Sequence, residues 1–238
     1  MKLRRAAVLI TSGTKRLGLA FAKESLALGF DVLLHYRTHT REARRWLSRH
    51  ADLAAHTHFI QKDITPENAR ELISESLSIA PRLVGLVNNA SSFSKGALQD
   101  IDHFAATIRT NALVPAALTS AFAAAVTRGW VINVTDAHIS AINIPHQNYR
   151  VSKMLLTELT RQQAALYAPK VRVNAIAPGP MLPAPGDSRE RFESLAKGIP
   201  LGRTGSPNLL RPAFSYLVTA EYVTGEVLHV DGGWHLRG

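Results

Sequence analysis

The sequence contains no cysteine among its 238 residues. This absence excludes disulfide bonds, thiol catalysis and thiolate metal ligands. It fits a reducing compartment, and we expect a cytoplasmic protein. Histidines do not supply a metal site instead. His56 and His58 share one face of an expected strand, but no third ligand of the kind found in zinc sites accompanies them.

Long hydrophobic runs are also absent. No stretch approaches the roughly 20 apolar residues that a membrane-spanning helix requires, and we expect no membrane association. The N-terminus "MKLRRAAVLI" begins like a secretion signal, with a pair of arginines. Its apolar run, Ala6 to Ile10, is too short for such a signal. We interpret this run as the first buried strand of a globular domain.

Acidic residues are scarce relative to basic ones, 18 against 28, which gives a formal net charge of +10. A basic chain can bind nucleic acid, or it can carry its excess charge on solvated helix faces and attract small anions. The densest basic segment, "REARRWLSRH", offers Trp46 and Leu47 for burial and its arginines for exposure, as in an amphipathic helix. No nucleic-acid-binding motif accompanies the charge, so we expect no nucleic-acid partner.

Short apolar segments alternate with longer segments of helical period along the whole chain. Strands separated in this way by helices form a parallel sheet that is covered on both faces. We therefore predict one α/β domain over residues 1–238 with a Rossmann fold, a doubly wound parallel seven-stranded sheet with helices on both faces. The segment 178–200, rich in proline, glycine and charge, is long for a connection, and it is either a substrate-binding loop or a plain surface loop. The predicted strands are 5–11, 31–36, 56–61, 83–87, 130–135, 171–176 and 226–230, and the predicted helices lie near 16–28, 40–50, 66–78, 100–127, 147–167 and 206–219.

The turn after the first strand has the composition of a phosphate-binding site. In "VLITSGTKRLGLA" a strand, a turn with Gly13 and Gly18, and a helix start follow one another, so backbone N–H groups and the helix dipole face one point. The end of the second strand, "LLHYRTHT", lacks the Asp or Glu that usually binds the ribose of NAD. Arg37, Thr38 and, in the turn, Arg16 instead suit a 2′-phosphate through charge-assisted hydrogen bonds. This pattern predicts NADPH as the cofactor.

Tyr149 and Lys153 are four residues apart and so share one face of a predicted helix. We expect the ammonium group to stabilise the phenolate and to lower the pKa of Tyr149, so that this tyrosine transfers protons near neutral pH. A Tyr-x-x-x-Lys pair alone is common in structural roles. Its meaning here depends on the dinucleotide-binding pattern around it.

Seven motifs together resemble the short-chain dehydrogenase/reductase family: "TSGTKRLG", "QKDIT", "LVNNAS", "RTNALVP", "YRVSK", "VRVNAIAPGP" and "VTGEVLHVDGG". The resemblance covers nearly the whole chain and implies hydride transfer at a nicotinamide by a homotetramer or homodimer. It implies that Asn111, Tyr149 and Lys153 are catalytic, with Asn111 acting through a water relay. The cofactor contacts that it implies are Thr11, Gly13, Arg16, Leu17, Gly18, Tyr36, Arg37, Thr38, Asp63, Ile64, Asn89, Ala90, Ser91, Tyr149, Lys153, Pro178 and Gly179.

Two positions depart from the family pattern. Ser12 stands where the turn usually has glycine, which leaves the shape of the turn open, and Asp136 replaces the catalytic serine. Neither nearby hydroxyl fills that role, because strand alternation turns Thr135 to the other face and Ser140 is too close to Tyr149 in sequence. A carboxylate would repel the oxyanion formed when a ketone is reduced, whereas the nitrogen of a C=N bond needs a proton that an acid can deliver. Asp136 therefore predicts an imine-like substrate.

Pteridine reductases and dihydromonapterin reductases resemble the chain in these details. The shared features are the arginine-containing turn, "HYRTHT", "NNASSF", the aspartate of "TDAH" and the chain end "DGGWHLRG". The resemblance implies NADPH-dependent reduction of 7,8-dihydropterins, such as dihydromonapterin or dihydrobiopterin, with dihydrofolate as a further candidate. It implies that Phe93 stacks on the flat pterin, which is reasonable for an aromatic ring. The implied substrate contacts are Ser91, Phe93, Asp136, Tyr149 and Met181.

Two other functions stay open. The chain could reduce a carbonyl group, as a 3-oxoacyl thioester reductase does, and Asp136 counts against this. It could also be an NADPH-binding sensor without turnover. The intact Asn111, Tyr149 and Lys153 count against a sensor, which has no need of all three.

Overall fold

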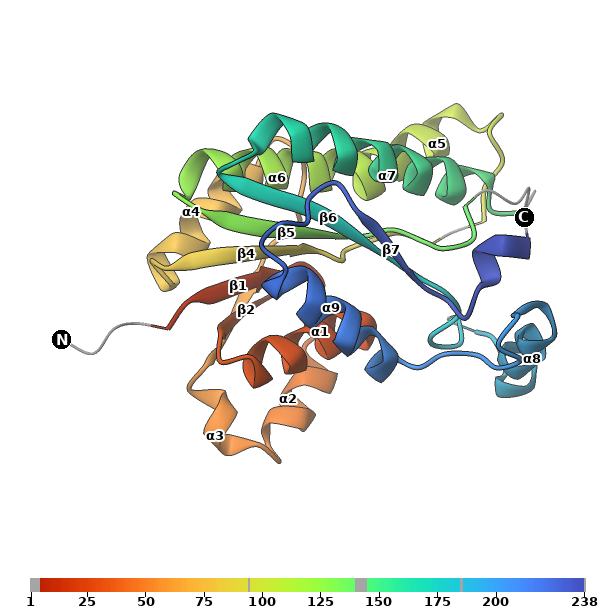
Figure 1. Ribbon diagram of the computed structural model, residues 1–238, viewed down its shortest axis with the longest axis horizontal. Coiled ribbons are helices and arrows are strands. Elements are labelled where there is room, and N and C mark those ends of the chain that lie inside the picture. The colour runs from red at the N-terminus through yellow and green to blue at the C-terminus, as the bar shows by residue number, and fades with distance from the viewer. Residues whose placement is uncertain (1–4, 94, 140–144, 185, 238) are drawn as a thin grey trace.

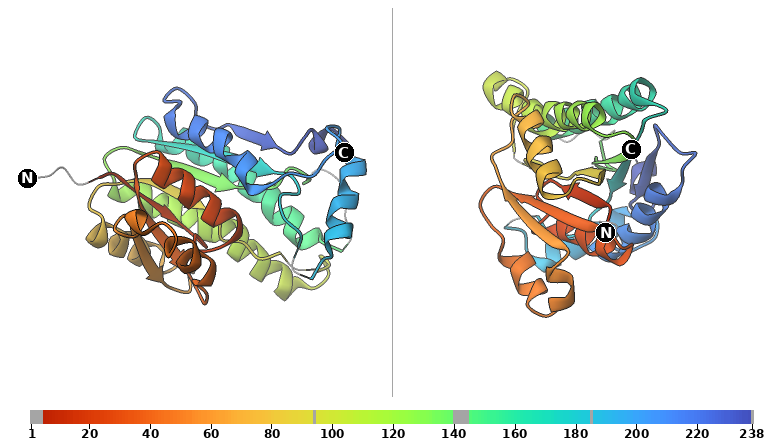
Figure 2. Two further views of the ribbon diagram at one scale, coloured as in Figure 1. Left: turned by 90° about the horizontal axis from the view of Figure 1, so that it is seen from below. Right: turned by 90° about the vertical axis from the view of Figure 1, so that its left-hand side faces the viewer.

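The computed structural model describes residues 5–93, 95–139, 145–184 and 186–237. Within these residues, seven parallel strands form one sheet in the order β3-β2-β1-β4-β5-β6-β7 (Figures 1 and 2). The order reverses between β1 and β4, so the sheet is doubly wound and the predicted fold class is confirmed. Ligands of such sheets bind beyond the carboxyl ends of the strands, near the reversal. The strands are β1 (Ala7–Ile10), β2 (Asp31–Tyr36), β3 (Thr57–Gln61), β4 (Leu83–Asn88), β5 (Gly129–Val134), β6 (Val171–Pro178) and β7 (Val227–Val230).

Helices cover both faces of the sheet. Figure 1 shows α4, α6 and α7 on one face and α1 and α9 on the other. No helix in the described ranges is long and apolar enough to cross a membrane. The α-helices are α1 (Arg16–Ala27), α2 (Arg41–Leu47), α3 (Ala51–Ala54), α4 (Ala69–Ile79), α5 (Ile101–Ile108), α6 (Val114–Ala125), α7 (Gln147–Tyr167), α8 (Arg189–Ser194) and α9 (Arg211–Thr219). A π turn, η1 (Arg109–Leu113), and the 3-10 helices η2 (Leu195–Gly198), η3 (Pro207–Leu210) and η4 (Trp234–Arg237) complete them.

Two apolar clusters explain why the central strands are apolar throughout. Successive side chains of a strand point to opposite faces. Leu9 of β1 therefore joins the cluster that includes α4 and α6, whereas Val8 and Ile10 join the cluster that includes α1 and α9. All four side chains of β1 are buried. This burial fixes the carboxyl end of β1, where the phosphate turn begins.

The structure corrects three of the expected boundaries. The helix predicted over 100–127 is interrupted by η1. Pro115 has no N–H to donate to the carbonyl of Asn111, four residues earlier, and a π turn accommodates such a gap. The segment 178–200 is less irregular than expected, because α8 and η2 lie within it and the Ser188 hydroxyl caps α8 by accepting the Arg191 N–H at 3.2 Å. The helix predicted near 40–50 ends earlier, as α2, and a further short helix, α3, begins just beyond the predicted range.

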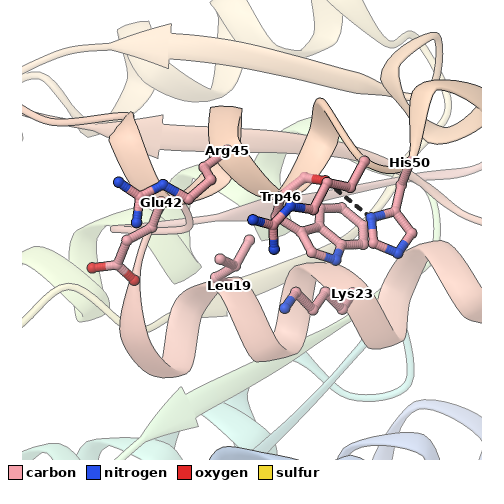
Figure 3. A pocket seen from close by; sticks show the side chains of 7 residues that line it. Leu19, Lys23, Glu42, Arg45, Trp46 and His50 are labelled. Atoms are coloured by element: carbon pink, nitrogen blue, oxygen red, sulfur yellow. Dashed lines mark hydrogen bonds between the residues drawn. The ribbon is translucent and has the colours of Figure 1, made fainter.

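The basic segment forms α2 with the expected amphipathic character. Ala43 and Leu47 are buried and the arginines of α2 are exposed, but Trp46 is only partly buried. Its indole lines a shallow cavity of about 220 Å³ between α1 and α2 (Figure 3). Lys23 Nζ lies 5.1 Å from the centre of this ring, and His50 stacks on it at 4.6 Å. The arginines of this basic segment therefore lie on a solvated face, as we expected.

Candidate active site

The turn between β1 and α1 has the backbone shape of an anion cradle. Ser12 and Arg16 have φ values of 49° and 50°, in the left-handed region that glycine adopts most easily. The Ser12 N–H donates to His35 Nδ1 at 3.2 Å, and the Gly13 N–H donates to the His35 carbonyl at 3.0 Å. A Cβ on Gly18 would lie 2.2 Å from the Ser12 carbonyl oxygen, so only glycine fits there. Ser12 thus takes the conformation that the missing glycine would favour.

His35 of β2 is a contributor to this turn that sequence reasoning missed. Burial lowers the pKa of His35, chiefly by disfavouring the charged ring. The neutral ring accepts the Ser12 N–H at Nδ1, so Nε2 carries the hydrogen and donates to the Lys62 carbonyl at 2.8 Å. The ring therefore links the turn to the segment after β3. A histidine inside an apolar strand was the only sequence signal for it.

Hydrogen bonds also fasten the ends of β1 and β4 together beside the turn. Thr11 Oγ1 accepts the backbone N–H groups of Asn89 and Ala90, both at 2.9 Å. The Asn89 amide donates to the carbonyl oxygens of Thr11 at 3.0 Å and Ser12 at 3.2 Å. The structure therefore brings the predicted cofactor contacts of these two strand ends to one place.

Charged groups meet at the end of β2. Arg37 lies 4.0 Å from Asp63, and both side chains are mostly exposed. The hydrogen bonds of Arg16 go to other partners. Its guanidinium donates to the Pro183 carbonyl at 2.9 Å, in the segment 178–200, and its backbone N–H donates to Glu42 at 3.1 Å. The other predicted contacts of this region are Leu17 and Ile64, which pack against the two apolar clusters, and Tyr36 and Thr38 at the end of β2.

Asn111 lies in the π turn with no solvent exposure. Its Oδ1 accepts the Ser91 hydroxyl at 3.2 Å and the Ser92 N–H at 2.8 Å. Its Nδ2 donates to the Ser92 carbonyl at 2.9 Å and to the Ser152 hydroxyl at 3.0 Å. The side chain therefore fastens the segment after β4 onto α7. Its backbone carbonyl lacks the usual helical donor because residue 115 is proline.

Asp136 directly follows β5, and Tyr149 lies in the first turn of α7. The Tyr149 hydroxyl donates to Asp136 Oδ2 at 2.9 Å, and the His138 backbone N–H donates to Asp136 Oδ1 at 2.8 Å. Lys153, one turn further along α7, is buried and donates from Nζ to the Val134 carbonyl at 2.7 Å. We call Asp136, Tyr149 and Lys153 the acid–tyrosine–lysine cluster. In it both carboxylate oxygens accept hydrogen bonds, as an ionised carboxylate does.

The expectation that Lys153 lowers the pKa of Tyr149 is wrong for this arrangement. Burial of the hydroxyl, and then the adjacent charge of Asp136, raise the pKa of Tyr149 well above its usual value because both disfavour a phenolate. Burial also lowers the pKa of Lys153 to about 8, against the opposing attraction of Asp136. Tyr149 is therefore a protonated donor at neutral pH, and Lys153 is the member whose charge changes at mildly basic pH.

Other polar candidates lie outside the cluster. The Thr135 hydroxyl donates to the Ile176 carbonyl at 3.2 Å, so it points away from Asp136 as alternation predicts. Ser140 lies outside the described residues. His56 pairs with Asp31 at 2.8 Å. No group of three or more His, Cys, Asp or Glu side chains in the described part of the chain is placed to hold a metal ion.

Phe93 forms an aromatic wall beside the cluster. Its ring is 51% exposed and stacks on His146 at 4.4 Å with an interplanar angle of 13°. It meets Tyr149 edge to face, at 4.8 Å and 89°. An exposed ring this close to the phenol suits a flat ligand. The structure thus brings Phe93 together with Asp136 and Tyr149.

Met181 lies apart from this group. It is buried and packs in the apolar cluster that includes α9. With Gly179 it lines a cavity of about 610 Å³ whose other walls are Pro180, Pro200, Leu201, Arg203, Thr204, Gly205, Leu209, His229, Val230, Asp231, Gly232, Gly233, His235 and Leu236. No member of the acid–tyrosine–lysine cluster lines this cavity. Pro178 ends β6, and its carbonyl accepts the Ala137 N–H at 3.1 Å, beside Asp136.

Two residues without a predicted role contact His138, which lies two residues after Asp136. Arg150, buried directly after Tyr149, donates to the His138 carbonyl and lies 2.9 Å from His138 Nδ1. Trp234 of η4 stacks on the His138 ring at 4.0 Å. The only sequence signal for Arg150 was its place beside the tyrosine on a helix face turned to the core. A charged group there requires hydrogen-bond acceptors.

The chain is similar to known proteins over nearly its whole length. A family model described as enoyl-(acyl carrier protein) reductase matches residues 13–235. A dihydromonapterin reductase from Citrobacter koseri is 31% identical, with 97% of each chain covered, and one from Escherichia coli is 30% identical over the same shares. The crystal structure of FolM alternative dihydrofolate reductase 1 from Brucella suis in complex with NADP is 29% identical. It matches with a TM-score of 0.90 and covers 97% of this chain and 95% of that one.

Proposed function

The chain belongs to the short-chain dehydrogenase/reductase family, and from this premise we propose that it is an NADPH-dependent reductase of 7,8-dihydropterins. The names of its relatives, and the NADP bound to a structural neighbour, support the cofactor and the substrate class. The observation that carries the substrate is the Tyr149–Asp136 hydrogen bond of 2.9 Å. It puts a carboxylate where a carbonyl reductase needs an oxyanion-stabilising donor.

The residues after β1 and β2 fit NADPH. Gly18 lets the turn pack directly against α1, because a Cβ there would lie 2.2 Å from the Ser12 carbonyl oxygen. The Lys15 side chain makes no capping hydrogen bond at the start of α1, where the Arg16 N–H donates to Glu42. Arg37 and Thr38, at the end of β2, would bind the 2′-phosphate, with no acid between them and α2. Lys153 would bind the nicotinamide ribose. When bound, NADPH supplies the hydride that goes to C6 of the pterin.

Asp136 would deliver the proton that pterin N5 requires as C6 receives the hydride. It is only partly buried, so it can take up a proton from solvent and pass it on, directly or through a water. Tyr149 stays protonated, and its hydrogen bond orients the carboxyl group. With a fully oxidised pterin, Tyr149 would serve N8 while C7 takes the hydride. The Asn111 carbonyl, which lacks its helical donor, would hold the water that links Lys153 to solvent.

The pterin ring would lie on the exposed face of Phe93. That ring already makes face-to-face and edge-to-face contacts with His146 and Tyr149, so its orientation is set before substrate arrives. Preorganised aromatic contacts favour a flat heterocycle over a flexible thioester chain. Ser91, whose hydroxyl donates to Asn111 in this structure, would turn that hydroxyl to bind the pterin or the cofactor phosphates.

A substrate panel tests the function. NADPH oxidation is followed in parallel with a dihydropterin, dihydrofolate and an acetoacetyl thioester, and the products are identified by mass. We expect turnover with dihydropterin, because the acid needed at N5 is present. Turnover with the thioester alone would overturn the proposal in favour of a carbonyl reductase. Tight NADPH binding without turnover of any member would favour a sensor.

We also propose a cytoplasmic homotetramer or homodimer that binds neither membranes nor nucleic acid. Exposed apolar side chains on α5 and α7 and at the end of η1 support assembly, among them Ile101, Leu113, Met154 and Leu166. Such side chains are typical of a surface that another subunit covers. Light scattering of the purified protein measures the assembly directly.

A further inference from the structure

His138 connects the carboxylate of the active site to a buried cation. Its backbone N–H donates to Asp136 Oδ1 at 2.8 Å. Its carbonyl accepts Arg150 Nη1, and its ring nitrogen Nδ1 lies 2.9 Å from Arg150 Nη2. Arg150 is 9% exposed. Asp136 thus holds His138 through the His138 backbone N–H, and Arg150 holds it through its carbonyl and its ring.

The hydrogen-bond chemistry fixes the protonation state of His138. A guanidinium has donors only, so Nδ1 of His138 must be the acceptor and the hydrogen must be on Nε2. A protonated ring would place an N–H against the guanidinium and would lose this bond. The link is therefore made only while His138 is neutral.

The C-terminal helix η4 covers the other side of the His138 ring. Trp234 stacks on it at 4.0 Å with an interplanar angle of 9°. The buried Asp231 anchors η4 by accepting the backbone N–H groups of Gly233 at 3.0 Å and His235 at 2.7 Å. Figure 1 shows η4 at the same edge of the molecule as α8.

The residues just before η4 contact the chain where the segment 178–200 ends. The Leu201 N–H donates to the Gly232 carbonyl at 3.1 Å. A Cβ on Gly232 would lie 2.7 Å from the Ile199 side chain, so these two segments of the chain are in direct contact. The position of Trp234 therefore depends on how the end of this segment is seated.

We propose that Arg150, His138 and Trp234 are positioning residues that hold Asp136 in place to deliver its proton, and that this support requires a neutral His138. The proposal rests on the proposed function. Arg150 and Trp234 both contact His138, and they act by fixing this residue, whose N–H binds Oδ1 of Asp136. The other oxygen remains for Tyr149 and the substrate.

The support has a definite pH dependence. The charged groups around His138 are Arg150 from α7, Asp136 from its own loop and Asp231 from the segment before η4. Burial, and then the charge of Arg150, lower the pKa of His138, and the two aspartates oppose this. The lowered pKa keeps the ring neutral through the physiological range. Acidification protonates the ring, breaks the bond to Arg150 and releases Asp136, so activity falls at a pH below the usual histidine value of about 6.5.

Steady-state kinetics of matched variants test the proposal. We expect His138→Ala, Arg150→Gln and Trp234→Ala to lower kcat for dihydropterin by roughly tenfold to hundredfold, the cost of a misplaced catalytic group, without raising KM for NADPH. His138→Asn should keep most of the wild-type kcat, because the Asn amide oxygen can accept from Arg150. Its pH–rate profile should lack the fall at acidic pH that protonation of His138 causes in the wild type. Trp234→Phe should likewise recover activity. His50→Asn, which alters the similar stack on Trp46 far from the site, is the control.

A measurement without turnover separates this proposal from the proposed function. Nitrogen-15 spectra of histidine-labelled protein report the tautomer and titration of His138. We expect the Nε2–H tautomer and a pKa of His138 below the usual histidine value of about 6.5, with this pKa rising in Arg150→Gln. A His138 ring that titrates at the usual histidine value of about 6.5 and does not respond to Arg150→Gln or Trp234→Ala overturns the proposal, as does wild-type kcat in His138→Ala. If the wild type turns over no dihydropterin while the spectra are as expected, the proposed function fails and the support around Asp136 stands.

Discussion

At the scale of single residues, Asp136 changes what its neighbouring tyrosine can do. A carboxylate 2.9 Å from the Tyr149 hydroxyl opposes ionisation of the phenol, and burial acts in the same direction. The usual proton donor of a carbonyl reductase is therefore held in its neutral form. The carboxyl group beside it is better placed to exchange a proton with solvent, which agrees with a substrate whose nitrogen must be protonated.

The lowered pKa of Lys153 gives a testable basic limb. Its side chain carries a charge below a pH of about 8 and loses it above that pH. If the ammonium holds the cofactor ribose, kcat/KM for NADPH should fall as the pH rises through about 8, since this ratio reports groups of the free enzyme. Lys153→Arg keeps its charge at these pH values and should shift the limb upward. A wild-type profile that stays flat to pH 9.5, within the roughly one-unit scatter of such values, would remove Lys153 from cofactor binding.

Spacing in the sequence identified the members of this cluster but not their electrostatics. Tyr149 and Lys153 follow from a four-residue interval, and Asp136 from its place after the fifth strand. The direction in which the pKa of Tyr149 moves depends on a competition between burial, the Asp136 carboxylate and the Arg150 guanidinium. That competition is decided by distances, which no interval in a sequence contains.

At the scale of elements, the strand–turn–helix unit depends on two small residues with different constraints. Ser12 takes a left-handed conformation that costs an L-residue roughly 1 kcal/mol. Gly18 has no room for a Cβ, because the Ser12 carbonyl would lie 2.2 Å away. The turn is thus strained at one position and sterically closed at the other.

Opposite outcomes are expected for substitutions at these positions. Ser12→Gly should raise the free energy of unfolding by up to about 1 kcal/mol, since it relieves the strain, with NADPH affinity retained. Gly18→Ala should weaken NADPH binding at least about tenfold, equivalent to 1.4 kcal/mol, because the turn must move away from α1. Urea denaturation and titration calorimetry measure the two effects. Unchanged NADPH affinity in Gly18→Ala would show that the cofactor does not use this turn.

Element boundaries show where sequence reasoning stopped. Strands follow from apolar runs, because both faces of the sheet are buried. The long helix over 100–127 was expected to be continuous, and Pro115 was the available sign that a turn would be inserted before it. The helix α8 was missed because its few residues are mostly charged and carry too little apolar period to stand out.

At the scale of the whole molecule, the order of the strands assembles the site. The reversal between β1 and β4 places the phosphate turn beside the segment that carries Ser91 and Phe93, and β5 brings Asp136 next to them. This arrangement was predictable from the alternation of strands and helices together with the family motifs. The contacts of Arg16 with Pro183 and of His138 with Trp234 join distant parts of the chain. They depend on how loops fold back, so no local pattern announces them.

The central claim is that Asp136 selects a C=N bond over a carbonyl group. The most direct test is a single-turnover comparison of wild type and Asp136→Ser, each preloaded with NADPH, against a dihydropterin and an acetoacetyl thioester. We expect the substitution to slow dihydropterin reduction by about a hundredfold or more, the usual contribution of a general acid. Thioester reduction should stay equal or rise, and NADPH affinity should not change. Equal rates of dihydropterin reduction in the two proteins would contradict the account.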